Sequence, residues 1–142
     1  MHCAIPSLND INVHDSLDER TAAENFLGKD LKQAEGLFRQ SFLRYQEDLM
    51  WMGPKAFCFY VHAAIAYLIS GDVSGDCDAV SSFCSVVNCR LDNDWDAIQP
   101  AHFAIREAVA FILADFPRYG CNPDIYGDVA SSYRTLFDRL GR

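Results

Sequence analysis

The sequence predicts an all-α protein, a single-domain bundle of about five principal helices with one short helix before them. Apolar residues recur at spacings of three and four over long stretches, which is the period of an amphipathic helix. No stretch alternates apolar and polar residues as a strand does, and Ala is more common than Val, Ile or Thr. A length of 142 residues fits one domain. We expect an irregular N-terminal arm over residues 1–20 and a helical domain over residues 21–142.

The first helices are predicted from their capping residues. Thr21 and Glu24 have the spacing of a capping box, in which each side chain satisfies a backbone N–H of the first turn, and they predict a short helix that ends at Gly28. Asp30 and Gln33 repeat this pattern at the start of a longer amphipathic helix. The apolar stripe of that helix has seven members: Leu31, Ala34, Leu37, Phe38, Phe42, Tyr45 and Leu49.

A second long helix follows at once. Gly53 interrupts the first one, and Pro54 is suited to the first turn of the next, where its missing N–H is not needed. Residues 54–70 are apolar on almost every side, and a helix of this kind is buried on most of its surface. We therefore place this helix at the centre of the domain.

Three further helices complete the predicted bundle. Asp76 or Asp78 is suited to cap a helix over residues 78–91. The next helix begins near Asp96 or Gln99 and ends at residue 115. The last one begins with Asn122 as the capping residue. Its expected inward positions are Ile125, Val129, Tyr133, Leu136 and Leu140.

The chain is acidic, and its acidic residues are concentrated in one region. The formal net charge is −8, which argues against a nucleic-acid binder, since such proteins need a basic face. Between residues 70 and 98, six acids stand against Arg90 alone, so the local net charge is −5. These acids form two triplets on either side of one helix: Asp72, Asp76, Asp78, Asp92, Asp94 and Asp96. They predict either an elongated acidic binding face or ordinary solvated and capping residues.

Among the six aspartates, Asp92 is the best supported position for a recognition surface, and Trp51 is a candidate apolar anchor beside them. Asp92 follows the C-terminal end of a predicted helix, where the helix dipole disfavours negative charge. Trp51 lies between two methionines in a connector between helices, and both residue types are common at recognition surfaces. Connectors in small helical bundles often hold an apolar plug, so we expect Trp51 to fold back onto the core under the connector. The alternative is that Trp51 is an apolar anchor for a partner.

No motif indicates a catalytic or metal centre. Asp92, Asp94 and Asp96 resemble the start of a calcium loop, but the required Gly and Glu are replaced by Ala97 and Phe103. We accordingly predict no catalytic residue, no metal site and no cofactor.

One further set of side chains leaves an alternative open. Cys58 and His62 share one face of the central helix. With His102, they could line a pocket of a small enzyme or ligand-binding protein.

The cysteines and the N-terminus indicate a reduced, cytoplasmic protein. The six cysteines contain no C-x-x-C pair, and the first residues lack both the basic and the apolar region of a signal peptide. Without a secretory signal, reduced thiols are expected. The longest apolar run, residues 56–69, is shorter than the roughly 20 residues that a bilayer requires, so no membrane association is expected.

Residues 26–68 resemble a group of small bacterial helical proteins. The resemblance rests on a motif of the form M-x-P-x-A-F-x-[FY]-Y, which here begins at Met52 and ends at Tyr60. Cys58 and His62 stand where that group has Arg or Lys and Pro, which weakens a catalytic interpretation of both. The resemblance implies a helical fold and no particular activity.

Two functional hypotheses follow. The first is a non-catalytic acidic protein that binds a basic protein partner, most concretely an immunity-type protein that neutralises a basic toxin, because complementary charge speeds association. The second is the small enzyme or ligand-binding protein with its pocket near Cys58. The sequence does not specify an oligomeric state.

Overall fold

The structure is a computed structural model that describes residues 4–141. Over this range the chain forms α-helices and short 3-10 helices and no strand, which confirms the all-helical prediction. The α-helices are α1 (Leu8–Ile11), α2 (Leu17–Phe26), α3 (Leu31–Trp51), α4 (Pro54–Leu68), α5 (Cys77–Asn93), α6 (His102–Ala114), α7 (Pro123–Tyr126) and α8 (Val129–Leu140). The 3-10 helices are η1 (Gly71–Val73), η2 (Trp95–Ala101) and η3 (Phe116–Tyr119).

The N-terminal region is more ordered than the sequence predicted. Residues 8–11 are helical and α2 begins at Leu17, whereas an irregular arm was expected over residues 1–20. The capping box of α2 joins Ser16 and Glu19, so the prediction of a box at Thr21 and Glu24 is wrong. Both pairs have the same spacing, and the buried carboxylate of Glu19 also bonds the preceding loop, which favours the earlier start.

Helices α3 and α4 meet at a close crossing with the N-terminal segment. Asp30 and Gln33 form the predicted capping box of α3, and α3 is kinked at Ser41. Gly53 separates the two helices. A Cβ at Gly53 would lie 2.1 Å from the carbonyl oxygen of Asp10, so this contact requires glycine. The Gly53 N–H donates to the carbonyl of Ile11 (2.9 Å) and joins the two segments.

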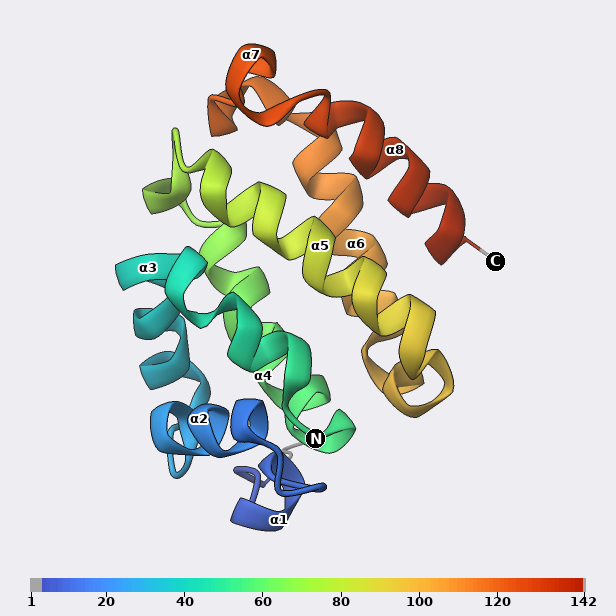
Figure 1. Ribbon diagram of the computed structural model, residues 1–142. Helices are drawn as coiled ribbons and strands as arrows, with labels where there is room; N and C mark the ends of the chain where they lie inside the picture. Colours follow the sequence, from blue (N-terminus) through green and yellow to red (C-terminus); the bar gives the residue numbers. More distant parts are fainter. Residues whose placement is uncertain (1–3, 142) are drawn as a thin grey trace.

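Helix α4 lies at the centre of the molecule, as predicted. It contacts α1, α3, α5, α6 and η2, and most of its apolar side chains are buried in one continuous core. One stripe of α4, which includes Lys55 and His62, remains exposed. Figure 1 shows α3 and α5 running side by side, with α6 and α8 on the opposite side of α5 from α3.

The predicted helix that begins near Asp96 consists of two elements. Residues 95–101 form η2, which contains Pro100, and α6 follows directly. By length and apolar composition the stretch Trp95–Ala114 could cross a membrane, and it is the one such stretch in residues 4–141. Its inward face, which includes Ile105, Val109 and Ile112, is buried.

The last helix and one pair of cysteines differ from the prediction. The last helix is broken at Gly127, which has a φ of 75°, so α7 and α8 are separate elements. Ile125 was expected to point inward but is 73% exposed on the short α7. Cys77 and Cys121 form a disulfide, so the expectation of reduced thiols is wrong for this pair. The two cysteines are 44 residues apart, and this separation matches no short cysteine motif that would have predicted the bond.

Candidate functional site

The first predicted group of aspartates is part of the packing at the N-terminal end of α5. Asp76 caps α5 by accepting a hydrogen bond from the N–H of Ala79 (3.2 Å), and it also accepts one from the hydroxyl of Tyr67 (2.6 Å). The hydroxyl of Tyr126 donates to Asp78 (2.9 Å). Burial and the bond to Asp76 raise the pKa of Tyr67 above its ordinary value. The carboxylates of Asp76 and Asp78 are therefore both engaged in hydrogen bonds within the protein.

An ion pair and a disulfide also link segments at the N-terminal end of α5. Asp72 pairs with Arg39, with a distance of 3.1 Å between Oδ2 and Nε. The disulfide between Cys77 and Cys121 ties the start of α5 to the loop before α7. The N-terminal end of α5 therefore holds together segments that are distant in the sequence.

The second group of aspartates lies at the C-terminal end of α5 and in η2. Asp92 forms an exposed ion pair with Arg139 (2.7 Å), and Arg139 supplies the positive charge that offsets an acid at this end of the helix. Asp94 pairs with Arg90 (2.7 Å). Asp96 is exposed, and its carboxylate forms no hydrogen bond or ion pair with another side chain in residues 4–141. The two groups therefore do not form one continuous row of unpaired charges.

Trp51, the last residue of α3, lies beside the second group. Its side chain is 43% exposed, so the interpretation of Trp51 as a buried plug is wrong. The neighbouring Met52 takes the inward position instead and is fully buried. Trp51 is thus an exposed aromatic residue on a backbone that is fixed by packing on both sides.

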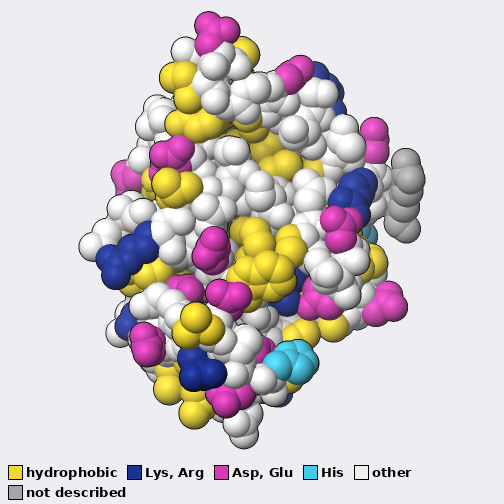
Figure 2. All heavy atoms as spheres, viewed as in Figure 1, with side chains coloured by type: hydrophobic (Ala, Val, Ile, Leu, Met, Phe, Trp, Pro, Cys, Tyr) yellow, Lys and Arg dark blue, Asp and Glu magenta, His cyan; other side chains and the backbone are white. Residues whose placement is uncertain are grey.

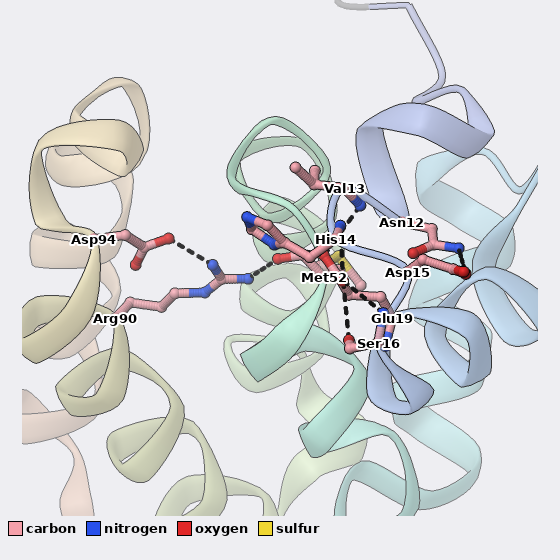
Figure 3. A network of polar contacts seen from close by, with 9 residues as sticks. All are labelled: Asn12, Val13, His14, Asp15, Ser16, Glu19, Met52, Arg90 and Asp94. Carbon is pink, nitrogen blue, oxygen red and sulfur yellow. Dashed lines mark hydrogen bonds and ion pairs between the residues drawn. The ribbon is translucent and has the colours of Figure 1, made fainter.

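Arg90 joins α5 to the junction of α3 and α4, as Figure 3 shows. Its guanidinium donates to Asp94, to the carbonyl of Leu49 (3.1 Å) and to the carbonyl of Met52. The guanidinium carbon also lies 4.6 Å from the centre of the Phe57 ring. Arg90 is only 5% exposed, and burial lowers its pKa while Asp94 opposes that change. Nε of Arg90 and Oδ1 of Asp94 are buried without a hydrogen-bond partner among the described residues.

Glu19 anchors the loop that faces Arg90 and Asp94 (Figure 3). Its carboxylate accepts hydrogen bonds from the N–H groups of Val13 (3.0 Å), His14 (2.9 Å) and Ser16 (3.1 Å), and from the Ser16 hydroxyl (2.9 Å). Burial raises the pKa of Glu19, but these hydrogen bonds outweigh burial and leave the pKa below its usual value. The carboxylate therefore stays ionised and fixes the loop.

A cleft of about 390 Å³ lies between these elements, and we call it the Trp51 cleft. Apolar side chains from the end of α3 line it together with three acids, Asp18, Glu19 and Asp94, one arginine, Arg90, and one histidine, His14. With His14 neutral, the three acids and Arg90 leave a formal charge of −2 on the described lining residues. Figure 2 shows acidic side chains around apolar ones on the face where α3 and α5 run side by side.

The alternative candidates are only partly brought together. Cys58 and His62 line a second pocket of about 600 Å³ beside α4. His102 does not line it: its ring contacts Trp95, and its Nε2 lies 2.5 Å from the carbonyl oxygen of Leu140. Within residues 4–141, no three His, Cys, Asp or Glu side chains are placed to hold a metal ion together. The three residues do not form one catalytic cluster.

Comparisons with known proteins found no matching family model, no similar curated protein and no similar solved structure.

Sequence reasoning missed the two residues that organise the Trp51 cleft. The sequence marks Arg90 only as the one base among six acids, and its buried position depends on carbonyl groups 38 and 41 residues away. Glu19 was assigned to the irregular arm. Its spacing from Ser16 was the available signal, and it matched the spacing that was instead assigned to Thr21 and Glu24.

Proposed function

We propose that the protein is a non-catalytic binding protein, and that it docks a basic protein partner at the Trp51 cleft. The exposure of Trp51 carries this proposal. Trp51 is 43% exposed at the end of α3, beside apolar and acidic side chains. Exposed aromatic residues in such surroundings are typical anchors of protein interfaces.

The charge distribution favours a basic partner. The lining of the cleft has a formal charge of −2, and the exposed Asp92 and Asp96 lie near its end of α5. The whole chain has a charge of −8, which attracts a cationic protein from a distance and speeds its association. The most concrete form of the proposal is an immunity-type protein that neutralises a basic toxin.

The proposed surface is narrower than the acidic face predicted from sequence. Trp51, Asp92, Asp94 and Asp96 belong to it. Asp72, Asp76 and Asp78 lie outside it, because they are at the other end of α5 from the Trp51 cleft and none of them lines it.

Affinity capture from a lysate of the source cells, at low and at high salt, tests this function with two matched variants. Trp51→Ser removes the proposed anchor. Leu43→Ser removes another exposed apolar side chain of α3, which is 55% exposed and does not line the cleft. We expect wild type and Leu43→Ser to capture the same basic protein in a one-to-one ratio, and Trp51→Ser to lose it.

The salt dependence separates a specific partner from general attraction. A docked partner should persist in part at high salt, because burial of Trp51 does not depend on ionic strength, whereas loose electrostatic binding is screened. Equal capture by wild type and Trp51→Ser, or capture of acidic proteins only, would contradict the proposal.

A further inference from the structure

The pocket beside α4 has the size and position of a small-molecule site. Its volume is about 600 Å³, within the range of roughly 300–1,000 Å³ that is usual for ligand pockets. Three separate parts of the chain form it: the N-terminal segment with α1, the exposed stripe of α4, and η2. We call it the α4 groove.

The walls of the α4 groove are mostly apolar. Ile5 and Pro6 come from the N-terminal segment, Phe59 from α4, and Ala97 and Pro100 from η2. Prolines and an aromatic ring give rigid walls, since their side chains have few conformations to lose when a ligand binds. This lining suits an apolar ligand body.

Two basic side chains lie at the rim of the α4 groove. Lys55 and His62 are seven residues apart on α4, which is about 10 Å along the helix, and both are exposed. Neither forms an ion pair with another residue in the range 4–141. The one acid among the described lining residues, Asp10, accepts a hydrogen bond from the N–H of Ser7 (2.9 Å) in the capping box of α1. The bonds from Ser7 and, less strongly, the charge of Lys55 lower the pKa of Asp10.

We propose that the α4 groove binds a small organic anion with an apolar body, such as a medium-chain carboxylate. The apolar chain lies along Phe59 between Pro6 and Pro100, and the carboxylate lies near Lys55. This site is separate from the Trp51 cleft, because among residues 4–141 the two linings share Pro54 alone.

The test uses decanoate as the probe, titrated into the full chain by calorimetry below its micelle concentration. Ala97→Leu fills part of the groove, and Ala110→Leu adds the same bulk to another apolar depression, between α4 and α6. We expect Ala97→Leu to weaken decanoate binding about ten-fold or more and Ala110→Leu to leave it unchanged. Thermal unfolding of both variants verifies that they are folded.

The charge of the ligand is tested separately. Lys55→Gln should weaken decanoate binding about two- to five-fold, the size expected of an exposed charge pair. Decylammonium, which has the same chain and the opposite charge, should bind more weakly than decanoate to wild type. The inference is overturned if decanoate does not bind, if only Ala110→Leu weakens its binding, or if decylammonium binds as tightly. None of these results bears on capture of a basic partner by Trp51.

Discussion

The two ends of α5 carry similar groups of aspartates in very different surroundings. At the N-terminal end, a disulfide, a helix cap and two tyrosine hydroxyls tie the chain together. At the C-terminal end, a single buried arginine holds three elements, and an open cleft lies beside an exposed tryptophan. The N-terminal end links distant segments of the chain, and the C-terminal end links segments and also has a cleft beside an exposed tryptophan.

This comparison shows that local charge alone does not identify a binding face. Asp76 and Asp78 are satisfied by groups that lie 9 and 48 residues away in the sequence, so their charge is used internally. Asp96 has the same residue type and no such partner in residues 4–141. The partners that the fold brings to each carboxylate decide which acids remain available for recognition.

The largest expected effect is at the C-terminal end. Arg90→Met should lower the free energy of unfolding by about 3–5 kcal/mol, because it removes one member of a buried ion pair and leaves Asp94 and two carbonyl groups without their donor. Arg139→Met is the control, since its pair with Asp92 is exposed and should contribute less than about 1 kcal/mol. Urea denaturation measures both. Equal losses would show that Arg90 is no more important than a surface residue.

The N-terminal end should respond to reduction. Breaking the bond between Cys77 and Cys121 should lower the free energy of unfolding by about 2–4 kcal/mol, because the unfolded chain gains freedom. Denaturation with and without dithiothreitol measures this, and the double variant Cys77→Ser/Cys121→Ser should lack the response. A response that persists in the double variant would come from other cysteines, and an unresponsive wild type would mean that the bond is absent.

The two ends should also differ in their response to pH. The pKa of Glu19 is below its unfolded value, so its stabilisation is present above about pH 4.3 and is lost as pH falls further. The pKa of Tyr67 is raised, so its stabilisation is present below about pH 10 and is lost as pH rises above that value.

Melting temperatures across the pH range test this difference. Glu19→Gln should flatten the acid side of the stability profile, and Tyr67→Phe should flatten the alkaline side. Each variant should leave the opposite side of the profile as it is in wild type. If either variant altered both sides of the profile equally, the assignment of Glu19 to the acid side and of Tyr67 to the alkaline side would be wrong.

The smallest effects on stability are expected at the exposed acids near the cleft. Asp92→Asn should change the free energy of unfolding by less than about 1 kcal/mol, because its pair with Arg139 is exposed. Asp96→Asn should leave it unchanged. Both should slow association with a basic partner and reduce its salt dependence. A loss of several degrees in melting temperature for Asp92→Asn would make it a structural residue.

Features encoded within one or two helical turns could be predicted from the sequence. The apolar period located the long helices, and the pair of Asp30 and Gln33 fixed the start of α3. The apolar composition of residues 54–70 placed α4 at the centre. Each of these depends on neighbours within a few residues, which a sequence shows directly.

Features that depend on distant partners could not be predicted. The disulfide joins residues 44 apart, and the bonds of Arg90 reach carbonyl groups 38 and 41 residues away. Two equal capping patterns compete in residues 16–24, and only the burial of Glu19 decides between them. Met52 is buried in the core and Trp51 is exposed, and composition alone does not predict which of these two neighbours is buried.

Hydrogen–deuterium exchange with and without the captured partner tests the central claim most directly. If the Trp51 cleft is the binding surface, the partner should slow exchange in residues 12–19, 49–54 and 89–96. It should leave residues 70–78 and 119–126, at the other end of α5, unchanged. Protection confined to those latter residues, or to the outer face of α6, would contradict the account.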